Sequence, residues 1–284
     1  MNDGTAPTGT GWFEDIAPDD AESASEAIAD GEADEPRDWP ALAVESGYAD
    51  SEDEYYDQLR EATLTATREA VRERERADDK QLVHAVRAMD DAERTANELA
   101  ERLAEWAGTL YDDAGVGIEG ARDLADKDPQ TPVEERVVSY ARRVADLADE
   151  RDDLRAFVES RAPALAPNLA EMAGPVLAAR LIALAGGLER LAKMPSGTVQ
   201  VLGAEDALFA HLEGRGSSPK HGIIYVHEYV RGTHPEHRGS AARAFAGKLA
   251  IAARIDHYSG EFKSEIHEEL AERMETIRAR EVAE

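Results

Sequence analysis

Residues 82–110 read LVHAVRAMDDAERTANELAERLAEWAGTL and repeat apolar side chains at alternating steps of four and three. This spacing is typical of a helix that packs lengthwise on another helix, so it predicts one long coiled-coil arm. One polar residue, Glu93, interrupts the apolar seam. The seam positions are Leu82, Val86, Met89, Glu93, Ala96, Ala100, Leu103, Ala107 and Leu110.

A second arm follows a glycine-containing segment, residues 112–129. Thr131, Pro132 and Glu134 form a helix start, because threonine caps the first turn, proline needs no N–H partner there, and glutamate completes a capping box. Two seams joined by a turn-rich linker predict a long antiparallel hairpin with arms of about 40–45 Å. The alternative is two legs of an ordinary bundle. The second seam is Val133, Val137, Tyr140, Val144, Leu147, Arg151, Leu154 and Val158.

The chain after the hairpin is less charged and also mostly helical in pattern. Residues 174–191 are apolar on nearly every face, which predicts one buried helix, with Gly186-Gly187 allowing close helix packing. Residues 193–203 read as a turn and a short apolar run, and the β-branched residues 222–230 are compatible with an extended segment. Helices are expected over 240–258 and 261–284. The predicted fold class is all-α.

The N-terminal 58 residues carry 18 acidic side chains and one basic side chain, Arg37. Few large apolar residues occur among them, which favours a largely disordered acidic arm. The alternative is a reduced α/β domain in which Trp12, Phe13 and Trp39 mark short strands or a docking surface. The predicted domains are therefore residues 1–58, the hairpin 59–162 and a C-terminal domain 163–284.

Charge is distributed unevenly along the 284 residues. The net charge is −28 and there is no cysteine, which excludes disulfides and thiolate chemistry. Such a charge argues against nucleic-acid binding, because polyanions repel each other. Residues 174–260, however, contain ten basic and seven acidic side chains. The acidic remainder indicates salt adaptation or contact with a basic partner, and the spared segment fits a phosphate-facing surface.

Neither a membrane segment nor an export signal is expected, so the predicted location is the cytoplasm. Loop histidines, His221, His227, His234 and His237, raise the hypothesis of a metal-dependent hydrolase. No HExxH, GxSxG or SxxK motif accompanies them, so we expect no metal site and no enzyme activity.

Polar and basic loop residues make a stronger candidate site. Short polar donors follow the apolar segment, and cations next to glycines follow later, a combination suited to contacts with RNA phosphates. The alternative is that these cations pair with the protein's own carboxylates. The candidate RNA-binding residues are Ser196, Thr198, Gln200, Lys220, His221, Arg238 and Arg243.

Three blocks carry a family resemblance. Residues 166–212 read APNLAEMAGPVLAARLIALAGGLERLAKMPSGTVQVLGAEDALFAHL, residues 217–230 read SSPKHGIIYVHEYV, and residues 237–262 read HRGSAARAFAGKLAIAARIDHYSGEF. They resemble the Nop domain of the archaeal Nop-family core protein of box C/D small ribonucleoproteins. Residues 78–106 are similar to that family's first coiled-coil arm, so the resemblance covers roughly 78–284.

The resemblance implies a scaffold of an RNA-guided 2′-O-methylation machine. Its implied partners are a box C/D guide RNA with a kink-turn, the small ribosomal-protein-like factor bound there, and fibrillarin, the methyltransferase. S-adenosylmethionine would be bound by fibrillarin, so this chain needs no cofactor of its own. The coiled coil would mediate self-association.

The chain departs from the family pattern in its N-terminal region and in the C-terminal domain. The N-terminal region is short, so fibrillarin docking would rest on Trp12, Phe13 and Trp39. Asp206 stands where the family usually has lysine, and residues 195–198 read PSGT instead of PAST. These changes motivate an alternative, a protein–protein adaptor that has lost RNA binding. The candidate partner-binding residues are Trp12, Phe13, Trp39, Gly203, Ala204 and Glu205.

Overall fold

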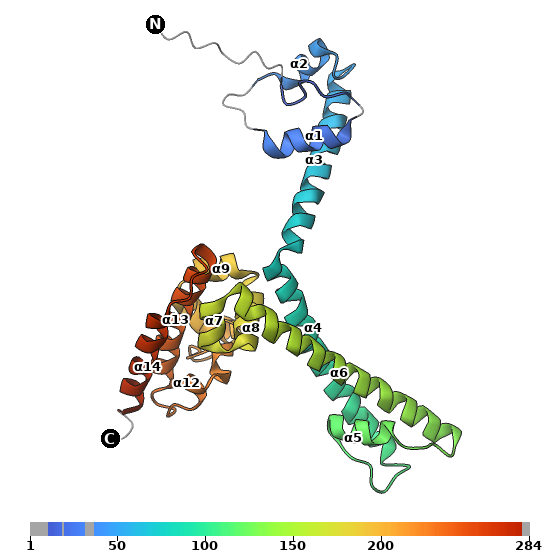
Figure 1. Ribbon diagram of the computed structural model, residues 1–284, viewed down its shortest axis with the longest axis vertical. Coiled ribbons are helices and arrows are strands. Elements are labelled where there is room, and N and C mark those ends of the chain that lie inside the picture. Colours follow the sequence, from blue (N-terminus) through green and yellow to red (C-terminus); the bar gives the residue numbers. More distant parts are fainter. Residues whose placement is uncertain (1–10, 19, 32–36, 280–284) are drawn as a thin grey trace. The chain divides into compact units, whose positions relative to one another are not determined.

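The computed structural model describes residues 11–18, 20–31 and 37–279 (Figure 1). Within these ranges the regular structure is entirely helical, which confirms the predicted all-α class. Contacts divide the chain into two compact units, Met1–Ala77 and Asp78–Glu284. The sequence analysis placed the end of the N-terminal region at residue 58. In the structure one continuous helix, Glu52–Arg76, crosses that position, and the first unit ends at Ala77.

Over its described residues the first unit contains three helices, each with an acidic or hydroxyl N-cap. They are α1 (Ala21–Asp30), α2 (Trp39–Ser46) and α3 (Glu52–Arg76), capped by the side chains of Asp20, Asp38 and Ser51. Such caps each stabilise a helix start by about 1 kcal/mol. Neither the disordered arm nor the short strands of an α/β domain are found among the described residues, so both predictions are wrong there. Residues 1–10, 19 and 32–36 of that region lie outside the described residues.

An aromatic cluster forms the core of this unit. The rings of Phe13 and Tyr48 stack at 5.1 Å, and Trp12 Nε1 donates to the hydroxyl of Tyr55 at 3.2 Å. Burial raises the pKa of both tyrosines, Tyr48 and Tyr55. Phe13 is 2% exposed and is therefore a core residue, whereas Trp12 and Trp39 are partly exposed.

The hairpin consists of α4 (Asp78–Ala107) and α6 (Pro132–Leu165), which pack along each other (Figure 1). They run antiparallel, because Arg161 near the end of α6 pairs with Asp78 at the start of α4, at 2.8 Å. At the other end, α5 (Gly117–Ala125) packs against both arms. Helix α6 begins at the predicted N-cap, where Thr131 Oγ1 accepts from the N–H of Glu134. The Glu134 carboxylate accepts from the N–H of Gln130 at 2.7 Å instead of completing the predicted capping box at Thr131.

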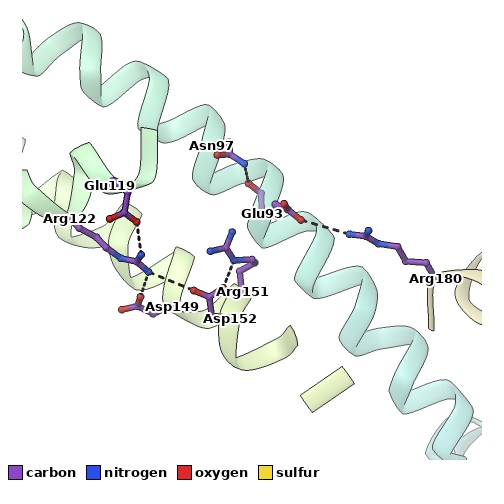
Figure 2. A network of polar contacts seen from close by, with 8 residues as sticks. All are labelled: Glu93, Asn97, Glu119, Arg122, Asp149, Arg151, Asp152 and Arg180. Carbon is purple, nitrogen blue, oxygen red and sulfur yellow. Dashed lines mark hydrogen bonds and ion pairs between the residues drawn. The ribbon is translucent and has the colours of Figure 1, made fainter. Parts of the chain in front are cut away.

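The one polar seam residue of α4 has a long-range partner. Figure 2 shows Arg180 pointing at Glu93, with the closest nitrogen–oxygen distance at 3.8 Å. Arg180 also donates Nε to Asp90 at 3.1 Å. Because Arg180 comes from helix α8 (Pro175–Ala185), the acidic seam position attaches the hairpin to the C-terminal domain. In the same figure Arg122 bridges Glu119 and two aspartates of α6.

The C-terminal domain surrounds α13, whose buried side chains include Phe245 and Leu249. The predicted helix 240–258 is confirmed as α13, and the predicted helix 261–284 is found over Ser264–Ala279, with Leu270, Met274 and Ile277 buried. Residues 280–284 of that prediction lie outside the described residues. The other elements are short. The order is α7 (Pro167–Ala173), α8, α9 (Leu188–Lys193), α10 (Ser196–Val201), α11 (Glu205–Leu212), η1 (Ile223–Val226), α12 (Glu228–Arg231), α13 (Arg238–Tyr258) and α14 (Ser264–Ala279).

The predicted helix 174–191 is wrong, because it breaks at the glycine pair. Gly186 adopts φ +85°, which ends α8, and Gly187 adopts φ +134°. A Cβ on Gly187 would lie 2.8 Å from Asp79 Oδ2, and Lys80 Nζ donates to the carbonyl of Gly186 at 2.8 Å. The pair therefore gives a close approach to α4 as predicted, but at a helix end.

Two further segments differ from expectation. The predicted turn and apolar run at 193–203 contains α10, and the proposed extended segment 222–230 forms η1 and α12. Gly222 explains the second difference, since its N–H donates to Gln200 O at 2.8 Å and a Cβ there would lie 2.0 Å from Leu202 O. This close backbone contact fixes the loop against α10 without a strand partner.

A buried carboxylate connects three segments of the domain. Asp256 of α13 is 6% exposed and accepts from the N–H groups of Asn168 and Leu169, at 3.0 and 2.8 Å, which caps α7. Asn168 in turn accepts from the N–H of Lys263 at 2.7 Å. Leaving such buried donors without an acceptor costs about 1–3 kcal/mol each.

Among the described residues, no single helix is long and apolar enough to cross a membrane. Helices α7 and α8 are long and apolar enough only when taken together, and the two are bent by 117° relative to each other.

Candidate RNA and protein interface

Three side chains, one from a loop, one from η1 and one from the first residue of α13, form a stack at the start of α13. The ring of His221 stacks on Tyr225 at 4.5 Å with an interplanar angle of 21°. The guanidinium of Arg238 lies over the same tyrosine ring, 5.6 Å from its centroid. Arginine favours this position because its planar, weakly hydrated cation stacks well on aromatic faces. We call Gln200, Lys220, His221, Tyr225 and Arg238 the stack patch.

Hydrogen bonds fix the cation of this stack. Arg238 donates Nε to Thr233 O at 3.0 Å and a terminal nitrogen to Arg231 O at 3.3 Å. The guanidinium is therefore held by the loop before α13 and by Tyr225. A side chain ordered in advance loses less conformational entropy when a ligand binds.

Lys220 is held by its backbone while its side chain remains exposed. Gln200 Nε2 donates to Lys220 O at 2.7 Å, which connects α10 to the loop. A Cβ built on Gly239 would lie 3.9 Å from the Lys220 side chain, so the lysine stem lies over the start of α13. The predicted residues Gln200, Lys220, His221 and Arg238 therefore do come together.

The imidazole of His221 is biased toward its neutral form. Burial lowers its pKa first, and the nearby positive charges of Arg238 and Lys220 lower it further. Near neutral pH the patch therefore presents two permanent cations beside a neutral, stacked ring.

Most cations of residues 174–260 have no carboxylate partner in the described part of the chain. Arg180, Lys193, Arg215 and Lys248 are ion-paired. The expectation that these cations pair with the protein's own carboxylates therefore holds for a minority. Those without an ion pair to a described residue are Arg190, Lys220, Arg231, Arg238, Arg243 and Arg254.

An apolar hollow of about 420 Å³ lies beside the stack patch. Two predicted partner-binding residues, Gly203 and Ala204, line it together with His221 and Tyr225. The third, Glu205, accepts from the N–H of Gly203 at 2.8 Å and so shapes the turn. Gly203 has φ +82°, and a Cβ there would lie 3.3 Å from Leu184 and Ile223 side-chain atoms.

Helix α11 follows this turn and has no buried residue. Phe209 and Leu212 are 60% and 70% exposed. The hollow is also lined by Leu184 and Val226, which are themselves exposed. The sequence analysis did not include Phe209, Leu212 and Tyr225 among the candidate site residues. The apolar content of the short segments next to the basic loops could have indicated them.

The remaining predicted RNA residues lie elsewhere. Ser196 and Arg243 line a separate groove with Lys248, Arg254 and Arg273, which we call the basic groove. Thr198 is exposed on α10. The seven predicted residues thus form two groups and one isolated residue.

The loop histidines do not converge. His227 stacks on Phe245 at 4.5 Å, whereas His234 and His237 face each other with ring centroids 6.3 Å apart. Among the residues the structure places, no group of three or more metal-ligating side chains is found.

Comparison with known proteins places the chain in a family. The family model described as "Nop: snoRNA binding domain, fibrillarin" matches residues 74–276. An uncharacterized NOP5 family protein of Methanocaldococcus jannaschii is 34% identical over 84% of this chain and 66% of its own length. Nucleolar protein 56 of Saccharomyces cerevisiae is 37% identical over 62% of this chain and 36% of its own.

A solved structure is also similar. A chain of the crystal structure of a fibrillarin/Nop5p complex aligns with TM-score 0.53 and 27% identity, covering 89% of this chain and 91% of that one. The present chain spans less than two thirds of the two relatives named above.

The class of protein defined here is all-helical, with a long antiparallel hairpin joined to a helical domain that carries a cationic patch and an apolar hollow. The chain belongs to the Nop family, as the resemblance predicted. Proteins of this family are non-catalytic, and fibrillarin is a separate polypeptide, in agreement with the prediction that this chain is not an enzyme.

Proposed function

We propose that this chain is the scaffold of a box C/D RNA-guided 2′-O-methylation ribonucleoprotein. The observation that carries the proposal is the stack patch, where Lys220 and Arg238 have no carboxylate partner among the described residues of a chain with net charge −28. Cations that have no carboxylate partner in a strongly acidic chain can attract a negatively charged ligand.

The stack patch suits a kink-turn RNA. Lys220 and Arg238 supply cations for phosphates, and the edge of His221 and the amide of Gln200 supply directional contacts. Structured RNA is recognised mainly through its shape and backbone, which such a set of donors can contact. The pre-organised Arg238 would set the register of the RNA on the protein.

The apolar hollow suits the small protein factor bound to that RNA. Leu184 and Val226 offer exposed apolar side chains in the hollow beside Gly203, Ala204 and His221, and α11, which follows directly, exposes Phe209 and Leu212. Large exposed apolar side chains that gather beside a polar patch are typical of protein interfaces. A composite RNA–protein surface would therefore contact both halves of the site at once.

The first unit is proposed to bind fibrillarin, which holds S-adenosylmethionine. Trp12 and Trp39 are its partly exposed aromatic residues, and its acidic side chains suit a basic partner. The hairpin would mediate self-association, because Trp106, Leu110 and Val133 are exposed near its distal end. We place the chain in the cytoplasm.

A gel shift tests the RNA side of this proposal. A kink-turn RNA bound to its small factor should be shifted further by the full chain. Lys220→Ala and Arg238→Ala should weaken that shift while circular dichroism stays unchanged. Arg215→Ala is the matched control, since Arg215 is an exposed cation of the same region already paired with Glu213. Equal loss with the control variant would contradict the proposal.

The alternative is an adaptor without RNA binding, and Asp206 favours it. This carboxylate is exposed in the first turn of α11, where it would repel a nearby phosphate. If the chain binds the small factor equally well with and without RNA, the adaptor function holds. If Asp206→Lys strengthens an existing RNA shift, the scaffold function holds.

A further inference from the structure

A second stack of an arginine on a tyrosine lies close to the stack patch. The guanidinium of Arg278 lies over the ring of Tyr229, 5.9 Å from its centroid, and the ring of His227 lies 4.9 Å from the same tyrosine. The stack patch has the same combination of arginine, tyrosine and histidine. The second stack contains none of the candidate RNA-binding residues, so it needs a separate explanation.

Arg278 lies in the last turn of α14 and contacts a different element, α12. A terminal nitrogen of its guanidinium donates to Glu228 O at 3.0 Å, across 50 positions of sequence. Figure 1 shows α14 ending beside α12. The base of Arg278 is fixed, because Met274 and Ile277 of α14 are buried in the domain core. Arg278 therefore attaches α12 to a firmly packed helix.

Helix α12 in turn holds the cation of the stack patch. Arg238 donates to Arg231 O, on the last residue of α12, and to Thr233 O, which follows it. The Thr233 hydroxyl donates back to Tyr229 O at 2.8 Å, and Thr233 is buried. Printed contacts of the protein thus connect Arg278 to Arg238 through this short helix.

Stability alone explains poorly why position 278 holds an arginine. Its Nε is buried and has no hydrogen-bond partner among the described residues. A buried donor without a partner costs about 1–3 kcal/mol, and more when the group is charged. An apolar side chain would avoid that cost but could not bond to Glu228 O, which points to a function for the guanidinium.

We infer that Arg278 is a positioning residue for RNA binding, which holds α12 in the orientation that presents Arg238. The inference rests on the proposed function and adds to it a residue that acts through another side chain. Helix α12 has only four residues, so it depends on contacts from outside for its order. Without Arg278 the carbonyls that hold Arg238 would shift, and ordering this cation would then oppose RNA binding.

Gel shifts with a kink-turn RNA bound to its small factor test this role in full-length variants. Arg278→Ala should bind roughly tenfold more weakly than the parent. Arg278→Lys keeps a donor for Glu228 O but stacks poorly on Tyr229, so it should lose less, roughly threefold. The control is Arg215→Ala, which removes an arginine paired with Glu213 and should bind like the parent.

A double-mutant cycle separates positioning from direct contact with RNA. In Arg238→Ala the side chain that Arg278 positions is already missing. Adding Arg278→Ala to this variant should therefore weaken binding by less than about twofold. An arginine that contacted RNA itself, or attracted it by charge alone, would add its full loss in the same background. If Arg278→Ala loses helix content in circular dichroism, the cycle is measured with Arg278→Lys.

The free chain offers a second readout that needs no RNA. The Nε–H of Arg238 is bonded to Thr233 O at 3.0 Å and should give an NMR signal that exchanges slowly with water. The missing signal in Arg238→Ala identifies it. In Arg278→Ala this signal should exchange faster, while the circular dichroism stays that of the parent.

Two results would overturn the inference and leave the proposed function intact. One is additive losses in the cycle, and the other is an unchanged Arg238 signal together with RNA binding like that of the parent in Arg278→Ala. A parent chain that fails to bind the RNA complex would instead overturn the proposed function. In that case the Arg238 signal would still show whether Arg278 positions that side chain.

Discussion

The guanidinium of Arg238 lies 5.6 Å above the ring centroid of Tyr225, and His221 stacks on the same ring at 4.5 Å. Tyr225 is thus the common support of two predicted RNA contacts, although it was not itself predicted. Its role is positional, since it holds one cation and one imidazole side by side.

Tyr225→Leu should therefore weaken RNA binding without unfolding the domain. Leucine retains apolar bulk but offers no face for Arg238 or His221, so both would lose order. We expect roughly a tenfold loss in affinity for the kink-turn complex, on the order of 1.4 kcal/mol. Tyr225→Phe, which keeps the ring, should bind like the parent in the same titration. A loss with phenylalanine as large as with leucine would assign the effect to the hydroxyl instead.

Gly222→Ala should disrupt the loop that presents the stack patch. A Cβ at this position would lie 2.0 Å from Leu202 O, so the backbone must move. We expect a loss of stability of about 1–3 kcal/mol in urea unfolding, together with weaker RNA binding. The matched control is Gly197→Ala, where a Cβ meets nothing within 4 Å. Similar stability of the two variants would show that the loop adapts freely.

Asp256→Ala should destabilise the C-terminal domain by about 3–5 kcal/mol, because it leaves buried donors on Asn168 and Leu169 unpaired. Asp256→Asn retains one acceptor and should cost less. Glu269→Ala, which removes an exposed carboxylate paired with the Lys248 side chain, is the control and should cost less than about 1 kcal/mol. Denaturant midpoints of the three variants give the ranking, and a reversed order would contradict the role of Asp256 as a buried cap.

Stability should fall as pH decreases below about 6.5, in part because of His227. Burial lowers the pKa of this imidazole in the folded state, so the unfolded chain binds the proton more readily. The stabilising contribution is complete above the unfolded pKa of 6.5 and is lost as pH falls through the lower, folded pKa. His227 Nδ1 also accepts from the N–H of Tyr229 at 3.2 Å, which protonation would prevent.

His227→Asn should flatten this dependence, since asparagine caps a helix without titrating in this range. Unfolding free energies between pH 5 and 7.5 for parent and variant provide the measurement, and the variant's absolute stability is not the criterion. Parallel curves would remove His227 as the cause.

Local periodicity explains what the sequence predicted well. The seam from Leu82 to Ala107 and the helix start at Thr131 depend on neighbours a few residues away. They predicted the hairpin and the residue at which its second arm begins. Alanine content and an apolar stripe likewise predicted α13 and α14. These features need no knowledge of distant residues.

Long-range contacts account for the errors. In the sequence Glu93 only interrupts the apolar seam, because its ion-pair partner, Arg180, lies far along the chain in α8. The donors to Asp256 are likewise distant, since Asn168 lies 88 positions away. The β-branched segment at 222–230 suggested an extended chain, but it forms η1 and α12, and Gly222 at its start is in close backbone contact with Leu202. The candidate residues were divided between two faces of α13 because that division depends on how α10 and the loops pack around it.

Removal of the first unit tests whether fibrillarin binds to that unit while RNA binds to the second unit. Deleting residues 1–77 should abolish binding of fibrillarin in a pull-down, because the aromatic and acidic surfaces are lost, while the kink-turn shift remains. Trp12→Ala in the full chain should weaken the same interaction. Undiminished fibrillarin capture by the deletion variant would place that partner on the hairpin or the C-terminal domain.

The most direct measurement of the central claim is methyl transfer in a reconstituted system. Guide RNA, the small kink-turn factor, fibrillarin and labelled S-adenosylmethionine are combined with or without this chain, and methylation of the target nucleotide is counted. We predict site-specific methylation only when the chain is present, with a strong loss for Arg238→Ala and none for Arg215→Ala. Equal methylation without the chain, or none with it, would contradict its role as the scaffold.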